Sequence, residues 1–416
     1  MIGTGVFTSL GFQLINIQSE FVIMLLWIFG GIIAICGALC YAELCAMMPR
    51  SGGEYHLLRE TWNPAIGFLA GWVSITVGFS APVAIAAKAL GHYAGESLGI
   101  AQPAWISVAV VILVTLIHLG HLRYTSGFQI LFTSFKIILI LILIIVTFVL
   151  TRSRPMSLTP QPGDLQTLFG SDFAVSLLYV TYSYTGWNAA AYIAGEIRNP
   201  QRNLPLAMLI GTAVVTVLYV CLNLAFLKAA PIDALQGQED VGRIAAIQLF
   251  GLKGGNLMGL LIALGLLSSI SSMTWAGPRV AAVMGEDYPK LKPLAQRNCY
   301  HIPWIALLLQ SSLVIILCLT VDLDQLMRYI QAILTLSSLL VVIGVFHLRR
   351  KRPNAYRPIR VPLYPLPLIL FGGMSAYILV YYLINKTSES LWGFLTLVLG
   401  YALYRIVGKT QSPDPN

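Results

Sequence analysis

Long apolar stretches separated by short polar segments follow one another along almost the whole chain. A helix rises 1.5 Å per residue, so about 20 apolar residues cross the roughly 30 Å hydrocarbon layer of a bilayer. Residues 2–16 form a shorter apolar stretch of about 22 Å, which is expected to form only half of a spanning helix. The pattern predicts eleven full spans near 21–46, 64–92, 103–120, 125–150, 170–196, 204–229, 255–284, 303–320, 324–347, 362–384 and 390–407.

Two of these apolar stretches are interrupted by glycine and polar residues. The first interruption is Gly3-Thr4-Gly5, and the second lies at 181–188, around Thr185. Glycine inside a helix costs about 1 kcal/mol relative to alanine, and within lipid a break releases backbone groups that need partners. Broken helices in corresponding halves of a chain are typical of the substrate site of a secondary transporter. The alternative is that these glycines only permit close helix packing.

The composition agrees with a membrane protein. The 416 residues are 57% hydrophobic and 10% charged, whereas soluble domains are about 25% charged. The net charge of +9 does not indicate a nucleic-acid partner, because the charges lie in short loops between apolar spans. No CxxC pair occurs, so the cysteines are expected to be small buried hydrophobic residues and no metal site is predicted. They are Cys36, Cys40, Cys45, Cys221, Cys299 and Cys318.

The positions of lysine and arginine predict the orientation. Most of them fall in alternate loops, including 47–63 and 348–360, which places these loops and the C-terminus in the cytoplasm and the chain in the cell membrane. The basic cluster at 349–352 is interpreted either as a contact to anionic lipid or as a stop-transfer signal. The 47–63 loop is expected to contain a short interfacial helix, and the amphipathic stretch 240–247 is expected to cap the outer face.

Five motifs together resemble one family, the amino acid–polyamine–organocation superfamily in its L-type amino-acid transporter branch. They are GTGVF at 3–7, YAEL at 41–44, PRSGGEY at 49–55, SYTGWN at 183–188 and GEIRNPQRNLPLA at 195–207, and the similarity covers nearly the whole chain in the same order.

The resemblance implies an all-α polytopic membrane protein with a LeuT-like fold of 5+5 inverted repeats. Residues 1–150 and 165–347 would form the repeats, 361–407 two further spans, and 408–416 a cytoplasmic tail. Family members have half a helix before the GTGVF equivalent. The first half of the first helix is therefore expected to be missing here, either because the true start codon lies upstream or because the product is truncated.

The first break suits a carboxylate. The N-terminal end of a helix beginning near Gly5 offers N–H groups and a positive partial charge. Gly3 and Gly5 allow close approach of a ligand because they lack a Cβ atom. By the family resemblance, Thr4, Gly5 and Val6 would hold the carboxylate of an amino acid.

The second break would complete the site. By the same resemblance, the substrate ammonium would be met by carbonyl groups at Ile2 and around Tyr182 and Ser183, and Tyr182 would be the outer gate. Thr185 stands where members that take large neutral amino acids have glycine, which favours small or medium neutral substrates. Ordinary aromatic packing is the alternative for Tyr182.

Lys136 lies in the middle of an apolar run, where a charged side chain costs about 2.5–3.5 kcal/mol and is functional by default. In sodium-independent family members a lysine at this place replaces the sodium ion of sodium-coupled relatives. Its ammonium would tie the first broken helix to the eighth span, and the alternative is a lysine that reaches the interface. On that span, Ser268, Ser271, Ser272 and Trp275 share one helical face.

Other polar residues are weaker candidates. Glu43 and Arg279 lie near the inner ends of their spans and are interpreted either as a cytoplasmic gate pair or as solvated interfacial charges. His118 and His121 are spaced i, i+3 at a helix end with no third ligand nearby. They are therefore expected to be interfacial rather than metal-binding.

The function predicted is secondary transport of amino acids, with neutral L-amino acids as substrates, by alternating access. The transport would be sodium-independent exchange or proton-coupled through Lys136. No enzyme activity or cofactor is predicted, and the Gly408-Lys409-Thr410 run is not a phosphate loop because position 403 is leucine.

The alternatives are a polyamine or other organocation transporter of the same superfamily, which would need acidic pocket residues, and a truncated protein that does not transport. The loop 93–103 has no cysteine, so no disulfide-linked heavy chain is expected, and the partners are an amino-acid substrate and the lipid bilayer, not nucleic acid.

Overall fold

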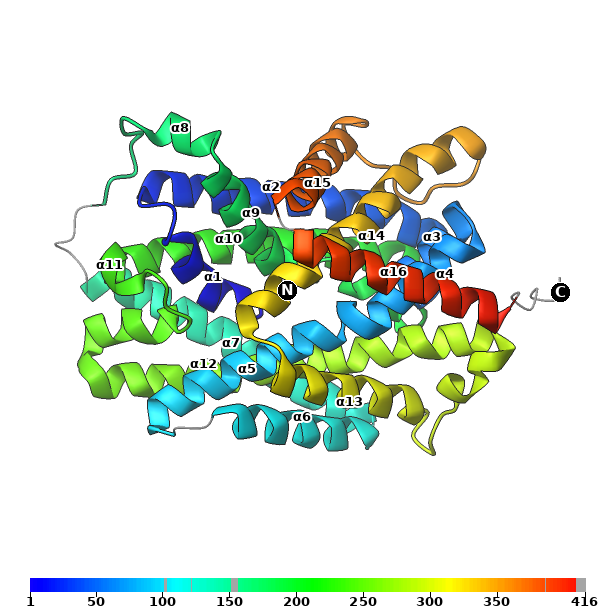
Figure 1. Ribbon diagram of the computed structural model, residues 1–416, viewed down its shortest axis with the longest axis horizontal. Helices are drawn as coiled ribbons and strands as arrows, with labels where there is room; N and C mark the ends of the chain where they lie inside the picture. Colours follow the sequence, from blue (N-terminus) through cyan, green and yellow to red (C-terminus); the bar gives the residue numbers. More distant parts are fainter. Residues whose placement is uncertain (101–102, 121, 151–155, 386, 409–416) are drawn as a thin grey trace.

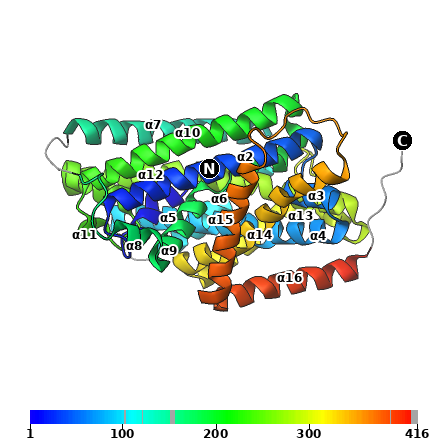
Figure 2. The same cartoon turned by 90° about the horizontal axis from the view of Figure 1, so that it is seen from above.

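The computed structural model describes residues 1–100, 103–120, 122–150, 156–385 and 387–408 of the chain. The described residues form helices joined by turns and loops, and no strand occurs among them. Figures 1 and 2 show that most of the long helices run side by side along the longest axis of the molecule. The prediction of an all-α polytopic membrane protein is thus confirmed, while the division into inverted repeats stays a prediction.

The helices have the following bounds. The elements are α1 (Gly5–Gln13), α2 (Glu20–Met47), α3 (Glu54–Thr61), α4 (Pro64–Val73), η1 (Ser74–Gly78), α5 (Ser80–Leu98), α6 (Pro103–Leu119), α7 (Leu122–Leu150), α8 (Asp164–Leu168), α9 (Ser171–Tyr184), η2 (Ala189–Glu196), α10 (Pro200–Ala229), α11 (Ile232–Leu235), α12 (Val241–Asp287), η3 (Pro289–Ala295), α13 (Trp304–Thr320), α14 (Leu323–Lys351), α15 (Leu366–Asn385) and α16 (Thr387–Val407).

The helices correspond to the predicted spans. Within the described ranges, seven are long and apolar enough to cross a membrane. Three more apolar helices are shorter, namely Ala104–Leu119, Trp304–Thr320 and Leu391–Val407. The remaining predicted span, 170–196, is divided between α9 and η2. Apolar side chains on the outward faces are exposed where lipid would contact them, as at Ile145, Val217 and Leu383.

The predicted span 64–92 is present but contains an irregular turn in its middle. A π-helical turn, η1, separates α4 from α5, and the N–H of Phe79 donates to the carbonyl of Ser74 at 3.0 Å. Pro82 explains why the helix restarts, since proline has no N–H and is tolerated only in the first turn. Pro82 is the third residue of α5, which begins at Ser80.

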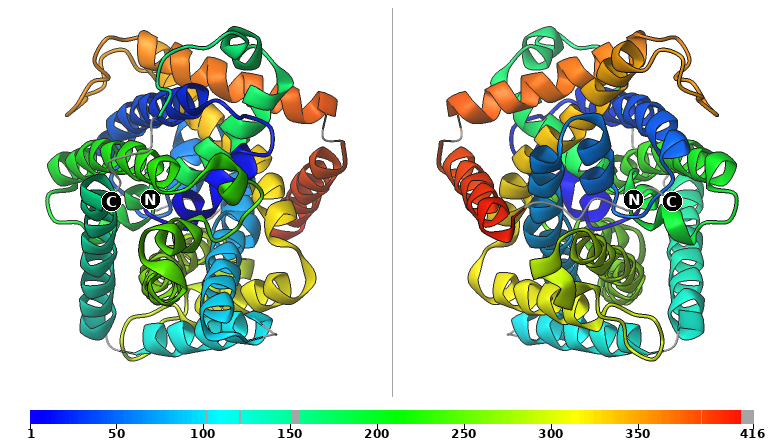
Figure 3. Two further views of the ribbon diagram at one scale, coloured as in Figure 1. Left: turned by 90° about the vertical axis from the view of Figure 1, so that its left-hand side faces the viewer. Right: turned by 90° about the vertical axis from the view of Figure 1, so that its right-hand side faces the viewer.

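The stretch 240–247, expected to cap the outer face, lies in the first part of α12, before a kink. Gly251 interrupts this 47-residue element with a φ of 71°, a left-handed value that glycine adopts without strain. The loop before α12 does cover α1, because the N–H of Gly237 in this loop donates to the carbonyl of Gly11 at 2.9 Å. Seen end-on in Figure 3, α1 lies inside the ring of longer helices.

The cysteines follow the prediction with two exceptions. Cys36, Cys40, Cys45 and Cys318 are buried, Cys221 is half-buried and Cys299 is exposed. Cys299 lies in the loop between η3 and α13, outside the apolar spans, so the prediction that it is buried is wrong.

Candidate functional site

The first helix break lies where it was predicted. Helix α1 begins at Gly5, and the side chain of its N-cap residue, Thr4, makes no capping hydrogen bond. The first-turn N–H groups of a helix have no partner within it, so those of Gly5 and Val6 are left to other acceptors. These residues are buried. The positive end of α1 therefore lies within the protein interior, where its attraction for an anion is strong.

The second break also lies near its predicted place. Helix α9 ends at Tyr184, Thr185 has an extended ψ of 155°, and Gly186 has a φ of 89°. Glycine adopts this left-handed φ readily, which lets the chain change direction before η2. The N–H and the hydroxyl of Thr185 both donate to the carbonyl of Tyr182, at 2.9 and 2.6 Å. That carbonyl, predicted to accept from a substrate ammonium, is engaged in this conformation.

The two breaks contact each other directly. The hydroxyls of Thr4 and Tyr182 are 3.2 Å apart, and those of Ser9 and Ser183 are 2.9 Å apart. A Cβ atom on Gly5 would come within 2.6 Å of the Cα atom of Ser183. Close packing therefore accounts for glycine at position 5 whether or not a ligand binds there. Tyr182 is buried between the breaks, and its role as a gate stays a prediction.

A cavity of about 460 Å³ lies beside both breaks. Ile2 and Gly3 line it from the first break, and Gly186 and Trp187 from the second. Helices α7, α10 and α12 provide the other walls. Ligand sites usually measure about 300–1,000 Å³, so the space admits an amino acid.

Lys136, on α7, joins the first break to α12. Its Nζ donates to the carbonyl of Ile2 and, at 2.7 Å, to the hydroxyl of Ser269, which in turn donates to the same carbonyl at 2.9 Å. The lysine side chain is buried with 3% exposure and lines the cavity. The Ile2 carbonyl, predicted to meet the substrate ammonium, is therefore already occupied by the lysine ammonium.

The serines predicted to contact Lys136 do not do so. Ser268 donates to the carbonyl of Gly265, Ser272 donates to that of Ser269, and Ser271 pairs with His118. Ser269 was not predicted, because helical spacing shows which residues share a face of a helix but not which face points toward α7. The run Ser-Ser-Ile-Ser-Ser at 268–272 offers a serine on nearly every side.

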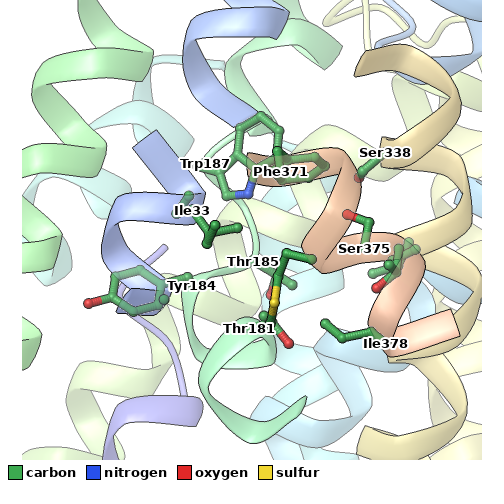
Figure 4. A pocket seen from close by; sticks show the side chains of 14 residues that line it. Ile33, Thr181, Tyr184, Thr185, Trp187, Ser338, Phe371, Ser375 and Ile378 are labelled. Atoms are coloured by element: carbon green, nitrogen blue, oxygen red, sulfur yellow. The ribbon is translucent and has the colours of Figure 1, made fainter. Parts of the chain in front are cut away.

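Thr185 lies between two smaller cavities of about 60 Å³ each. In Figure 4, Thr181 and Thr185 of α9 face Ser375 and Ile378 of α15 around the first of them. The second extends from Thr185 toward Phe79 of η1–α5 and Glu54 of α3. Each has room for about two water molecules, since a water takes about 30 Å³ in the liquid.

The predicted pairing of Glu43 with Arg279 is wrong. Glu43 is buried and pairs with Arg349 on α14 and Arg357 in the following loop. Arg279 pairs with Glu196 at 2.5 Å, and its guanidinium lies over the ring of Trp275. Both carboxylates are met by arginines distant in sequence, so neither pair could be read from local spacing.

A further cluster at the same end of the molecule was not predicted. Asp287, the last residue of α12, accepts hydrogen bonds from Arg50 at 2.9 Å and from Tyr55 at 2.5 Å, and also pairs with Arg59. The cluster joins α3 to the end of α12. Its residues lie in the PRSGGEY motif and beyond it, but no spacing rule connects them to position 287.

The histidine prediction needs a correction. His118 is buried with 4% exposure rather than interfacial, and its Nε2 lies 2.9 Å from the hydroxyl of Ser271. His121 lies outside the described residues. Among the residues that were described, no group of three or more His, Cys, Asp or Glu side chains could hold a metal ion.

Comparison with known proteins decides the family. The family model described as amino acid permease matches residues 1–403. The chain belongs to this family. It is 30% identical to the b(0,+)-type amino acid transporter 1 of Mus musculus over 410 residues, covering 96% of this chain and 82% of that protein.

Two more relatives match over nearly the whole of this chain. The serine/threonine exchanger SteT of Bacillus subtilis (strain 168) is 28% identical over 417 residues, which are 97% of this chain and 92% of SteT. The large neutral amino acids transporter small subunit 2 of Mus musculus is 27% identical over 423 residues, which are 97% of this chain and 77% of that protein. The family resemblance inferred from the motifs is thereby confirmed.

Proposed function

We propose that the chain is a secondary active transporter that moves neutral L-amino acids across the membrane by alternating access. Its family and the names of its relatives support amino acids as the substrate class. The cavity of about 460 Å³ beside both helix breaks supports the location of the site. An α-carboxylate would bind the positive end of α1, where anions are stabilised.

The observation that carries the proposal is the contact of Lys136 with the Ile2 carbonyl and Ser269. A fixed ammonium at this place performs the task of a bound cation, because it holds the first break against α12. Transport would then need no sodium and would proceed by exchange or with proton coupling. A buried lysine is also costly in lipid, so its retention favours a function.

The orientation follows from the basic residues. The α3 end carries Arg50, Arg59 and the cluster at 349–352. This excess of basic residues supports the proposal that the α3 end and the C-terminus face the cytoplasm of a cell-membrane protein. A heavy chain linked by a disulfide is not proposed, because the sequence between 93 and 103 has no cysteine.

Reconstitution into liposomes tests the proposal. Uptake of radiolabelled amino acids would be measured with and without internal amino acid, sodium and a pH gradient, with polyamines among the competitors. Uptake should be competed by small or medium neutral amino acids and be independent of sodium. Lys136→Ala should reduce uptake at least about tenfold, whereas Lys253→Ala, at an exposed lysine of α12, should not change it. Sodium-dependent uptake, or full activity of Lys136→Ala, would contradict the proposal.

A further inference from the structure

Glu54 is a buried carboxylate that the transport mechanism above does not use. It is the first residue of α3, which lies outside the membrane-spanning helices, and its side chain is 1% exposed. The ion pairs found among the described residues do not include it. A carboxylate without a cationic partner is costly to bury in the charged form, so this site is either protonated or stabilised by hydrogen bonds.

The two oxygens of Glu54 have different surroundings. Oε1 accepts hydrogen bonds from Tyr41 at 2.6 Å, Asn188 at 3.1 Å and Ser338 at 3.2 Å. No hydrogen-bond partner for Oε2 is found in the described part of the chain, although this atom is buried. A buried carboxyl oxygen without a hydrogen-bond partner indicates that the carboxyl is protonated and that the proton is on Oε2.

The cavity beside Glu54 gives the proton a route. It has a volume of about 60 Å³, which admits about two water molecules but no organic substrate group. Asn188 and Ser338 line it together with Glu54, and it reaches Thr185 and Gly186 at the second break. Water here can accept a proton from Oε2 or return one. The ligand that suits this site is therefore a proton rather than an amino acid or a metal ion.

The contacts of Glu54 connect three separate elements of the fold. Tyr41 belongs to α2, Asn188 precedes η2, and Ser338 belongs to α14. Tyr41 and Tyr192 are the titratable side chains that face the carboxyl. Hydrogen bonds to an ionised carboxylate are roughly twice as strong as those to a neutral acid. Ionised Glu54 thus holds the three elements together, and protonation loosens them.

We propose that Glu54 is a proton-binding site whose charge controls the separation of α2, η2 and α14. Burial raises the pKa of this carboxyl, while the hydrogen bonds from Tyr41, Ser338 and Asn188 act in the opposite direction. Below its pKa the site is neutral and its contacts are weak. Above its pKa the site is ionised and its contacts are strong.

Infrared spectroscopy tests the proton site without any transport. Difference spectra between acidic and neutral pH should contain the carbonyl band of a protonated carboxylic acid. The exposed carboxyls also contribute to this absorption, so the prediction concerns one component of it. That component should be lost in Glu54→Gln and retained in Glu60→Gln, which makes the same change at an exposed position of the same helix. A band that is unchanged in Glu54→Gln would overturn the proposal, and this result does not depend on whether the chain transports amino acids.

The second measurement rests on the proposed transport function. Exchange by the wild-type protein in liposomes should become at least about threefold slower as the pH rises through the pKa of Glu54, because the ionised form holds the elements together. Glu54→Gln should be independent of pH and match the fast, acidic rate. If Glu54→Gln keeps the wild-type pH profile, the control of the three elements is refuted.

Tyr41→Phe tests the same proposal if the Glu54→Gln protein does not fold. It leaves the carboxyl in place and removes one donor to Oε1, so the ionised form loses support and the pKa rises. The midpoint of the infrared band and of the exchange profile should move upward by about half a pH unit or more. An unchanged midpoint in both measurements would also overturn the proposal.

Discussion

The two ends of the molecule are closed by different chemistry. At the α3 end, charged groups meet: Asp287 binds Arg50 and Arg59, and Arg279 binds Glu196. In Figure 1 this end lies on the right and α11 on the left.

The α11 end has one ion pair with little exposure, between Asp240 and Arg243 at 3.0 Å, but its contacts to α1 are neutral. The rings of Phe12 and Tyr179 stack at 5.4 Å, and the backbone of Gly11 packs against that of Gln238. Ion pairs respond to salt, to pH and to the loss of one partner, whereas stacked rings and backbone contacts respond mainly to shape. If the chain alternates between two open states, the ion cluster at the α3 end responds to the solution, whereas the contacts of α1 at the α11 end do not.

The largest effect is expected from Asp287→Asn. The change leaves Arg59, whose side chain is 10% exposed, without its anion, while Arg50 is 41% exposed and can turn to water. Removing one partner of a buried pair costs about 3–5 kcal/mol, and the exposure of Arg50 places this case near about 3 kcal/mol. Denaturant titration of the purified protein measures the free energy of unfolding.

Glu286→Gln is the matched control for Asp287→Asn. The neighbouring Glu286 pairs with Arg297 at 3.1 Å, and both side chains are about half exposed. Exposed pairs are worth about 0–1 kcal/mol, so this variant should lose less than about 1 kcal/mol. Equal losses in the two variants would show that burial of the ion cluster is not what closes the α3 end.

A smaller effect is expected from Gly11→Val at the α11 end. A side chain at this buried position would meet the backbone carbonyl of Gln238. Overpacking of this kind typically costs about 1–3 kcal/mol, and we expect about 2 kcal/mol with no dependence on salt. Gly373→Val is the control, because a Cβ atom there has nothing within 4 Å. A loss that shrinks at high salt would contradict the neutral character of this end.

The sequence was sufficient to predict the membrane spans and the two helix breaks. Apolar length determined the spans, and the glycines beside Thr4 and Thr185 marked the interruptions. Gly186 has a left-handed φ of 89°, whereas Gly5 leaves room for Ser183. These features depend on residues that are neighbours in the chain. The identity of the family could be read for the same reason, since each motif is a local run.

The partners of the polar residues could not be predicted, because they depend on tertiary packing. Glu43 was assigned to Arg279 but binds Arg349, 306 residues away in sequence. Ser269 was missed because the rotation of α12 about its axis is not encoded in the spacing of its serines. Glu54 lies in the 47–63 loop, for which only a short interfacial helix was predicted, and the packing of α2, η2 and α14 around it shows that it is buried.

His56 provides a pH test of the α3 end. Burial lowers its pKa to about 4, with a further contribution from the charge of Arg50, whereas the ordinary value is 6.5. At pH values between the two pKa values, the unfolded chain binds more protons than the folded one. The free energy of unfolding should therefore fall as the pH falls. The expected loss from about pH 7 to about pH 5 is about 1.5 kcal/mol, and denaturant titration at the two pH values measures it.

His56→Gln should remove most of this acid sensitivity, since glutamine takes up no proton. His301→Gln, at an exposed loop position, should retain it. If the wild type and His56→Gln lose the same stability on acidification, His56 is not the group responsible, and the pH response of the α3 end must arise from its carboxylates.

The smallest effect is the coupling between Phe12 and Tyr179. A double-mutant cycle with Phe12→Leu and Tyr179→Leu keeps both sites apolar and isolates the coupling between the two rings, which is worth about 0.5–1.5 kcal/mol. Measured by denaturant titration, the coupling energy should be the same at low and high salt. The corresponding cycle for Glu286 and Arg297 should give a coupling that decreases with salt, because those side chains are exposed to the screening ions. A stacking energy that decreases in parallel would mean that charged groups also support the α11 end, and the contrast between the two closures would then be one of degree rather than of kind.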